Sequence, residues 1–401
     1  MERHDTIIIG GGQAGLAMSH HLRERGREHL LIERERLGGK WHSERWDSLH
    51  FQFPNWALRL PGHGYSGDDP EGFSHYSKVI DFLADYARLV DPPVRQAEVL
   101  RVSRSDDGLR LETSDGEIEA RIVVVATGAF PHPFIPAFAE RISPEIHQLH
   151  SSAYRRLEQL PPGGVLVIGS GSSGGQIAEE LQLSGRDVFL SVSRHQKFPR
   201  RMLGKDMLWW LYELGRIDRT IDAMPDRRAP PALLVSGIDG GHDLDVRKFA
   251  ADGMTLLGRA IGADSDALLL EDNLAAMLAD IDAGFERFRA EVVDHARKSG
   301  MNIDQDEPPA WPQPPSPGER LDLRAAGITS IIWCTGYRPA FGWIDIPLFD
   351  DRGSPIQQRG TTACPGLYFL GLHWMHTLKS GALFGVGDDA EFIADHLPTE
   401  H

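Results

Sequence analysis

The stretch that decides the fold is TIIIGGGQAG, residues 6–15. Its first four residues form a short, largely apolar and β-branched run, which is typical of a buried strand. Gly10, Gly12 and Gly15 follow in the G-x-G-x-x-G spacing of a dinucleotide-binding turn. In that pattern the first glycine permits a tight turn, the second lets the backbone approach a pyrophosphate, and the third lets the helix pack closely on the strand. The sequence therefore predicts a strand, a turn and a helix that bind a dinucleotide.

The predicted helix begins with Gln13 and Ala14, whose free backbone N–H groups would face the phosphates. The next apolar run, residues 29–32, ends at Glu33, which lies 18 positions after Gly15 (33 − 15). An acidic side chain near this position accepts hydrogen bonds from a ribose. A glycine-rich turn beside a surface glutamate is the alternative, but it would not require strand, glycines, helix and acid in this order.

The same pattern recurs near the middle of the chain. Residues 165–168 predict a second buried strand, residues 176–183 carry a helical pattern, and residues 187–192 predict the next strand. The turn between the first two of these elements is predicted to bind a second dinucleotide through Gly169, Gly171, Ser172, Ser173 and Gly174. Two such sites in one chain indicate a flavoprotein, because one dinucleotide normally stays as the flavin while the other delivers hydride to it.

No carboxylate follows the last strand of this second unit. Ser193 and Arg194 come next, and Arg194 lies 20 positions after Gly174 (194 − 174), where an NAD-selecting acid would stand. An arginine can pair with a 2′-phosphate that an acid would repel, so the sequence predicts NADPH rather than NADH. Lys197 could add a donor, and so could Arg200 and Arg201. The alternative is a solvated basic loop.

Two further strands are predicted to end where the chain crosses between layers. One leads into Thr127 and Gly128, and the other into Thr335, Gly336 and Tyr337. We therefore expect an α/β fold with two Rossmann-like dinucleotide-binding domains, the NADPH domain being inserted in the FAD domain together with a helical insertion at 273–299. The predicted boundaries are residues 1–155 and 327–401 for the discontinuous FAD-binding domain and residues 156–326 for the NADPH-binding domain.

Composition limits the partners. The 401 residues carry a formal net charge of −16, which argues against nucleic acid, and no run of 18 apolar residues predicts a membrane span. The first strand follows the initial methionine without a signal-peptide pattern, so we expect a cytoplasmic protein. The run Trp209–Tyr212 suits a core, a dimer face or a substrate wall, which leaves a homodimer open.

Metal and thiol chemistry are not predicted. Cys334 and Cys364 lack the spacing of zinc, iron–sulfur or dithiol redox sites. The 18 histidines show no metal-ligand spacing, and no Ser-His-Asp or paired-carboxylate arrangement is evident. Disulfide reductases that depend on a dithiol are therefore excluded, and no metal site is expected.

With both nucleotide sites recognised, the chain resembles the flavin-containing monooxygenases over nearly its whole length. This family includes Baeyer–Villiger enzymes and plant indole-pyruvate monooxygenases. The resemblance implies FAD in the first site and NADPH in the second. It further implies that the flavin lies along Gly39, Lys40 and Trp41 and that the C-terminal segment at its edge contains Gly371, Gly385 and Gly387.

The linker of the family is kept only in part. His150 and Tyr154 retain its histidine and aromatic residue, but Pro144 and Ile146 stand where phenylalanine and glycine belong. The resemblance also places residues 49–61 at the reactive face of the flavin. Gln52, and less strongly Asn55, are then candidates for a polar group near flavin C4a; an amide bonded to loop backbone is the alternative.

The resemblance implies an enzyme that reduces FAD with NADPH, forms a C4a-(hydro)peroxyflavin with O2 and oxygenates a small organic substrate at nitrogen, sulfur or a carbonyl carbon. Two alternatives remain open. One is an NADPH oxidase or flavin reductase that does not oxygenate a substrate. The other is a flavoprotein that senses nucleotides without turnover.

Overall fold

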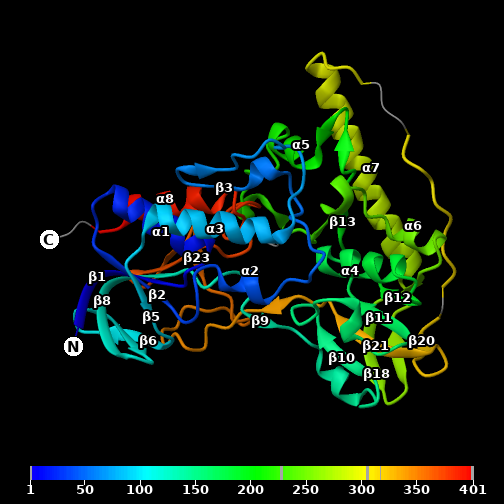
Figure 1. Cartoon of the computed structure of the whole chain (residues 1–401), viewed down its shortest axis with the longest axis horizontal. Helices are drawn as coiled ribbons and strands as arrows, with labels where there is room; N and C mark the ends of the chain where they lie inside the picture. The colour runs from blue at the N-terminus through cyan, green and yellow to red at the C-terminus, as the bar shows by residue number, and fades with distance from the viewer. Residues whose placement is uncertain (1, 226–228, 304–306, 317, 399–401) are drawn as a thin grey trace.

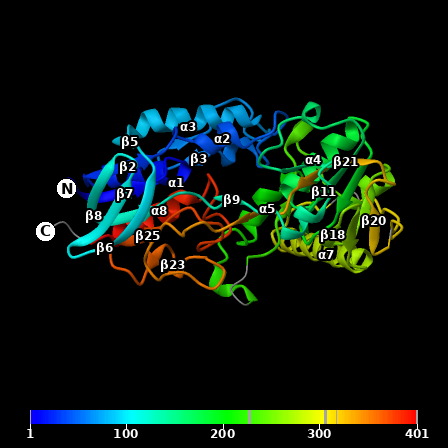
Figure 2. The ribbon, with the colours of Figure 1, turned by 90° about the horizontal axis from the view of Figure 1, so that it is seen from below.

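The protein is described by a computed structural model that covers residues 2–225, 229–303, 307–316 and 318–398. It consists of two lobes side by side, each built on its own β-sheet (Figure 1). The first lobe contains both the beginning and the end of the described chain, and the second lobe is formed by the middle (Figures 1 and 2). The predicted α/β fold with two dinucleotide-binding units is confirmed.

The sheet of the first lobe has nine strands around a parallel centre. β1 pairs in parallel with β2 on one side and with β8 on the other, and β25 joins β8 in parallel from the C-terminal end of the chain. The path is β23 (Gln357–Gln358), β24 (Thr361–Thr362), β25 (Leu367–Phe369), β8 (Gly116–Val125), β1 (Glu2–Ile9), β2 (His29–Glu33) and β5 (Val94–Gln96). Off this path, β7 (Gly108–Thr113) pairs with β8, and β6 (Val99–Ser105) pairs with β7.

Three helices cover the upper side of this sheet in Figure 1. They are α1 (Gln13–Glu24), α3 (Tyr76–Val90) and α8 (Val386–His396). α1 packs between α3 and α8, and its buried face contributes Leu16, Met18 and Leu22 to the core. Because α1 follows β1 directly and α8 comes last in the chain, the C-terminal segment closes the N-terminal dinucleotide unit.

The sheet of the second lobe is fully parallel, which is why its strands read as continuous apolar runs. Its order is β10 (His147–His150), β21 (Ile328–Trp333), β11 (Gly164–Ile168), β12 (Val188–Ser191) and β17 (Thr255–Leu257). Helices α4 (Ser172–Leu183), α6 (Val246–Ala251) and α7 (Leu274–Lys298) accompany it, with an antiparallel sheet of β18 (Ala260–Asp264), β19 (Ala267–Leu270) and β20 (Arg320–Asp322).

This sheet corrects the predicted domain boundaries. β10 and β21 both pair within the second sheet, although the boundaries at 155/156 and 326/327 assign them to the first domain. The error arises because a strand that precedes or follows a linker carries no sequence mark of the sheet it joins. The inserted unit therefore extends at least from His147 to Trp333.

The chain crosses between the two lobes at two points. After β8 and after β21 the chain passes from one sheet towards the other, and the two passing segments pair as β9 (His132–Pro133) and β22 (Tyr337–Arg338). This antiparallel ribbon lies between the lobes in Figure 1. Among the described residues, no helix combines the length and the apolar character that crossing a bilayer requires.

The Trp209–Tyr212 run lies on α5 (Met207–Glu213). Trp210 is fully buried and donates its indole N–H to the Met202 carbonyl at 2.9 Å, so its role is in the core. Trp209 and Tyr212 are only half-buried. Within this run, only these two residues are exposed enough to contact a partner or a substrate.

A buried ion pair fixes the start of α5. The Arg200 guanidinium donates to both carboxylate oxygens of Asp206, at 2.9 and 2.7 Å, and the two side chains are 3% and 1% exposed. Asp206 also caps α5 by accepting from the Leu208 backbone N–H. Arg200 further donates to the Gln52 carbonyl at 2.8 Å, so the pair joins the middle of the chain to the loop that contains Gln52.

We expect Asp206→Asn to destabilise the protein by about 3–5 kcal/mol, because it leaves the Arg200 charge buried without its counter-ion. Asp85→Asn is the matched control, since Asp85 pairs with Arg88 on an exposed face where a pair contributes at most about 1 kcal/mol. Urea titration of the free energy of unfolding measures both effects. Equal small losses in the two variants would contradict this role of the buried pair.

Candidate functional site

The first dinucleotide turn is held by contacts that exclude any side chain at two of its glycines. Gly10 has φ +107°, and a Cβ there would lie 2.6 Å from the Ala126 carbonyl oxygen. A Cβ at Gly15 would lie 1.9 Å from the Gly10 carbonyl oxygen. At Gly12, in contrast, a Cβ would meet nothing within 4 Å. The turn is therefore closed against the sheet and open on the side where a pyrophosphate would bind.

The second turn repeats this geometry. A Cβ at Gly169 would lie 2.4 Å from the Cys334 carbonyl oxygen, and a Cβ at Gly174 would lie 1.8 Å from the Gly169 carbonyl oxygen. Gly171, the counterpart of Gly12, has only the Ala232 side chain at 3.5 Å. No side chain caps α1 at Gly12 or α4 at Gly171, so the first N–H groups of both helices are available to an anion. Both turns fit a dinucleotide pyrophosphate.

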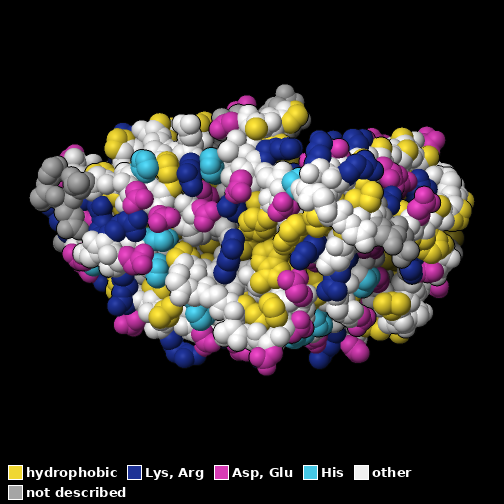
Figure 3. Space-filling model, turned by 90° about the horizontal axis from the view of Figure 1, so that it is seen from above, with side chains coloured by type: hydrophobic (Ala, Val, Ile, Leu, Met, Phe, Trp, Pro, Cys, Tyr) yellow, Lys and Arg dark blue, Asp and Glu magenta, His cyan; other side chains and the backbone are white. Residues whose placement is uncertain are grey.

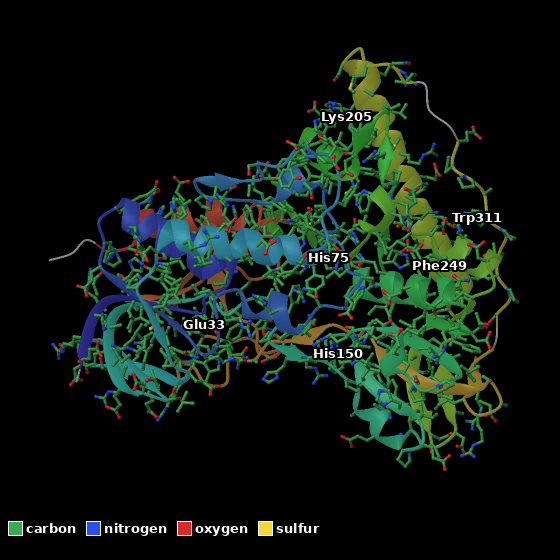
Figure 4. The ribbon with its side chains drawn as sticks, in the orientation of Figure 1. Glu33, His75, His150, Lys205, Phe249 and Trp311 are labelled. Carbon is green, nitrogen blue, oxygen red and sulfur yellow. The ribbon has the colours of Figure 1, made fainter. Side chains whose placement is uncertain are left out.

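Glu33 and Ser193 occupy equivalent positions in the two units. The Gly11 backbone N–H donates to the Glu33 carboxylate at 2.7 Å, and the Ser170 backbone N–H donates to the Ser193 hydroxyl at 3.0 Å. Each residue thus connects the end of the second strand to the middle of the glycine turn (Glu33 is labelled in Figure 4). The structural counterpart of the acid is therefore Ser193, and Arg194 is the next residue.

The basic residues after β12 are in different situations. Arg194 is exposed and forms no hydrogen bond or ion pair within the described part of the chain. Lys197 is directed elsewhere, because its ammonium pairs with Asp245 at 2.5 Å and lies 4.5 Å above the Phe285 ring. The guanidinium of Arg200 is used by Asp206. Of the cations proposed for a 2′-phosphate, Lys197 and Arg200 are thus occupied by acids of the protein.

A histidine that the sequence does not single out supports the second turn. The His195 Nδ1 lies 2.9 Å from the Ser170 hydroxyl, and its Nε2 is buried without a hydrogen-bond partner among the described residues. Burial lowers the pKa of His195 to about 4, so the ring is neutral near pH 7. The side chains of Ser170, Ser193 and His195 together fix the loop between the turn and Arg194.

The serines at the start of α4 differ in availability. The Ser172 hydroxyl donates to the Leu233 carbonyl and thereby attaches α4 to β16 (Leu233–Leu234). Ser173 is half-buried, and its hydroxyl has no partner within the described ranges. Ser173 is therefore the member of this pair that is free to donate to a phosphate.

Residues at the predicted flavin position are brought together from both ends of the chain. The Gln13 side-chain amide donates to the Gly381 carbonyl at 2.7 Å, and Trp41 Nε1 lies 3.5 Å from the Gln13 side-chain oxygen. Gly39 begins the short helix α2 (Gly39–Ser43). The Lys40 ammonium donates to the Phe130 carbonyl. Gln13 thus joins the start of α1 to both α2 and the C-terminal segment.

The glycines of the C-terminal segment are required by contacts within the protein. A Cβ at Gly371 would lie 2.6 Å from the Ala14 Cβ, and one at Gly387 would lie 2.7 Å from Pro61. A Cβ at Gly385 would lie 2.5 Å from the Lys379 carbonyl oxygen. These three positions were predicted to bind the cofactor. The structure explains them as sites where the segment packs against α1, the 59–62 loop and itself.

The Thr-Gly segments lie at the ribbon between the lobes. Gly128 and Gly336 have φ +89° and +79°, and the Thr335 hydroxyl donates to the Phe134 carbonyl. His150 (labelled in Figure 4) has its Nε2 3.0 Å from the Gly336 carbonyl oxygen and its ring edge-on to Tyr337 at 5.1 Å. The linker histidine therefore braces the second crossing. Thr127 precedes Gly128 at the matching point of the first crossing.

The two amides proposed for the flavin face behave differently. Asn55 is 4% exposed and donates to the Asp69 carbonyl at 2.8 Å, which is the loop-backbone alternative considered for it. Gln52 is half-buried, and its side-chain amide forms no hydrogen bond within the described residues. The Asn55 amide thus uses its N–H group within the loop and leaves its buried Oδ1 without a partner among the described residues, whereas the Gln52 amide keeps both its polar atoms for a ligand.

Apolar side chains gather near the middle of one face, where the lobes meet (Figure 3). Half-buried aromatic residues of the 53–56 loop and α5 pack near one another, and Trp56 and Tyr212 approach to 6.0 Å between ring centroids. Phe384 packs edge-on against Phe53 at 5.1 Å. The Arg59 guanidinium donates to the Tyr212 hydroxyl at 2.7 Å. These rings and the Arg59 guanidinium form one cluster of contacts between the 53–59 segment, α5 and the segment just before α8.

Together the two uncapped turns, the ribbon and the enclosing C-terminal segment define the class of two-dinucleotide flavoproteins. A profile of the family described as pyridine nucleotide-disulphide oxidoreductase matches residues 7–208. The chain is 32% identical over 400 residues to the "Uncharacterized oxidoreductase CzcO-like" of Geobacillus kaustophilus, with 98% of each chain covered. The chain belongs to the pyridine nucleotide-disulphide oxidoreductase family.

Relatives and solved structures place it beside the flavin monooxygenases. It is 29% identical over 209 residues to "Indole-3-pyruvate monooxygenase YUCCA6" of Arabidopsis thaliana, covering 49% of this chain and 50% of that one. Its fold matches a flavin-containing monooxygenase from Stenotrophomonas maltophilia with a TM-score of 0.70 at 22% identity, over 98% of each chain. It also matches the OTEMO complex with FAD and NADP, with a TM-score of 0.55 at 16% identity over 98% of this chain and 85% of that one. The protein is a flavin-using oxidoreductase.

The cysteines do not supply disulfide chemistry. Cys334 and Cys364 are both free. Burial raises the pKa of the Cys334 thiol to about 12, so it is not a thiolate at neutral pH. Cys334 directly follows β21, and its carbonyl lies against Gly169, so it has a packing role beside the second turn.

A histidine on the loop beside α4 makes stability pH-dependent. The His242 Nε2 contacts the Glu179 carboxylate of α4 at 2.8 Å, and this hydrogen bond raises the pKa of His242 above 6.5. A raised pKa in the folded state stabilises the protein fully below the unfolded pKa, and this contribution is lost as pH rises through the folded pKa.

We expect His242→Gln to be less stable than the unsubstituted protein at about pH 6, and the difference to shrink towards about pH 8. Chemical denaturation at several pH values measures it. His147→Gln is the control, since His147 is exposed at the start of β10. A difference that grows with pH would contradict the pairing.

Proposed function

We propose that this protein is an FAD-dependent, NADPH-consuming monooxygenase that transfers an oxygen atom to a small organic substrate. The observation that carries the proposal is the pair of open glycine turns, on α1 and α4, in two lobes joined by a paired ribbon. Its family and the FAD- and NADP-bound neighbour support this assignment.

FAD would bind along the first turn. The N–H groups that start α1 would hold its pyrophosphate, and Glu33 would accept from the ribose, since a carboxylate has acceptor capacity beyond the Gly11 and Glu35 amides it already binds. Gln13, Gly39 and Trp41 would line the path towards the flavin ring. Bound FAD supplies the redox chemistry: reduction by NADPH, formation of a C4a-peroxyflavin with O2, and oxygen transfer to nitrogen, sulfur or a carbonyl carbon.

NADPH would bind along the second turn. Ser193 replaces the acid that repels a 2′-phosphate, and the free guanidinium of Arg194 follows it directly. Ser173 adds a hydroxyl at the start of α4. The neutral His195 holds the Ser170 loop without adding charge of its own.

Gln52 is the residue that we propose to face the reacting flavin atom. An amide can donate a hydrogen bond to a bound oxygen species without giving it a proton, which favours a long-lived oxygenating form. The aromatic group of Trp56, Tyr212 and Phe384 would then exclude water and receive an apolar part of the substrate. O2 and this small molecule are the remaining reactants.

The second candidate is an NADPH oxidase that releases hydrogen peroxide. The observation that favours it is the changed linker, where Pro144 and Ile146 replace the phenylalanine and glycine of the monooxygenase pattern. A flavoprotein that senses nucleotides would bind both cofactors but would not transfer electrons between them.

Stopped-flow absorbance separates these candidates. Mixing the NADPH-reduced holoprotein with aerated buffer is expected to give a C4a-adduct spectrum that persists, because bound NADP+ and the closed site exclude water. Prompt reoxidation with stoichiometric peroxide would instead establish the oxidase, and a flavin that NADPH does not bleach would establish the sensor. Gln52→Ala is expected to shorten the adduct lifetime at least about tenfold while leaving flavin reduction unchanged. Asn55→Ala cannot serve as its control, because Asn55 is bonded within its own loop. Gln358→Ala can, because Gln358 is exposed on β23 and its side-chain amide forms no hydrogen bond within the described residues.

The choice of nicotinamide cofactor gives a second test. Arg194→Ala is expected to lower the ratio of kcat/KM for NADPH over NADH by about 10- to 100-fold, because it removes a charge-assisted hydrogen bond to the 2′-phosphate. Ser193→Glu should lower the same ratio further by restoring a carboxylate. Arg297→Ala is the matched control, since Arg297 is exposed near the end of α7 and belongs to neither nucleotide turn. A ratio unchanged in the first two variants would remove Arg194 and Ser193 from cofactor selection.

A further inference from the structure

Three potential metal-ligating side chains converge on the last turn and a half of α1. His20 Nε2 lies 3.4 Å from one oxygen of the Glu24 carboxylate, and His21 Nδ1 lies 3.4 Å from the other. One ligand atom from each of the three residues lies within 4.8 Å of the other two. Donor atoms that share one tetrahedral metal ion with bonds of about 2.0–2.2 Å lie about 3.3–3.6 Å apart, which the two 3.4 Å distances to Glu24 match.

The histidine side chains are arranged before any ligand arrives. His21 is 6% exposed, and neither of its ring nitrogens has a hydrogen-bond partner among the described residues. A buried polar group without a partner is unfavourable, and a metal ion would supply the missing interaction at Nδ1. The His20 ring is fixed on its other side, because a Cβ at Gly62 would lie 3.0 Å from its Cε1 and the Tyr86 ring is 6.1 Å away.

The charges around the cluster favour a cation. The end of α1 carries the partial negative charge of the helix C-terminus, and the Glu24 carboxylate adds a full charge. Glu391 of α8 lies near enough to interact with His21. The one nearby cation, Arg25, is bonded to Asp395 and to the His21 carbonyl, so its charge is already paired.

We propose that His20, His21 and Glu24 form a binding site for a divalent transition-metal ion such as Zn2+. Two imidazole nitrogens and one carboxylate oxygen are ligands that zinc accepts, and Glu24 is exposed enough to leave a fourth position for water or another ligand. The site is separate from both dinucleotide turns. It lies eight or more residues beyond Gly12 on the same helix, which corresponds to about 12 Å or more along the axis.

This site differs from the sequence-based expectation that no metal would bind. The residues stand at i, i+1 and i+4, and adjacent histidines point about 100° apart around a helix. That spacing by itself does not predict a shared ligand. The convergence depends on Glu24, which lies one turn beyond both histidines, and on the surroundings that set the two rings.

In the test, chelator-treated holoprotein with its flavin bound is titrated with Zn2+, and calorimetry measures the binding. We expect one ion per chain, and a Kd that rises at least about tenfold in Glu24→Gln and in His20→Ala, because each removes a ligand. Glu28→Gln is the matched control: Glu28 is an exposed carboxylate 3.6 Å from a single histidine, His4. Its Kd should equal that of the unsubstituted protein.

Flavin content and thermal midpoint in the absence of metal establish that each variant is folded. Co2+ in place of Zn2+ should give d–d absorption that is lost in the same two variants. The proposal is overturned if no ion binds at one per chain, if Glu24→Gln and His20→Ala bind as before, or if Glu28→Gln loses as much affinity as they do.

Discussion

The structure depends on how closely the third glycine of each turn approaches the first glycine, at the start of α1 and of α4. In each unit the third glycine of the turn lies so near the first that a single methyl group would come within about 2 Å of a carbonyl oxygen. This approach brings the helix N-terminus against the carboxyl end of the sheet. Free N–H groups then point to one spot in each lobe, and the second strand can contact the turn through Glu33 or Ser193.

The rest of the first site is built from distant parts of the chain that meet at this turn. Gln13 reaches the Gly381 carbonyl, and Gly371 lets the C-terminal segment pass against Ala14. The ribbon of β9 and β22 holds the second lobe at the same end of the sheet, with His150 against Tyr337. The ribbon and this histidine therefore join the two lobes just beyond the ends of β8 and β21.

The protein uses most of its positive charge internally. With a net charge of −16 it contains many acids, and Lys197 and Arg200 are each paired with one of them. Such pairs stabilise the loops around α5 and α7 but cannot serve a phosphate ligand. Arg194, by contrast, forms no ion pair among the described residues. Its guanidinium is therefore available to a phosphate ligand.

The sequence by itself determined the two strand–turn–helix units and the helical character of residues 273–299, because glycine spacing and apolar periodicity act on the local backbone; the structure shows that this stretch is one helix, Leu274–Lys298. Only the tertiary structure decided which sheet β10 and β21 join, that Asn55 binds the Asp69 carbonyl, and that Lys197 faces Asp245. It also brought His20, His21 and Glu24 together. These outcomes depend on the direction of side chains and on partners far along the chain, which local patterns do not specify.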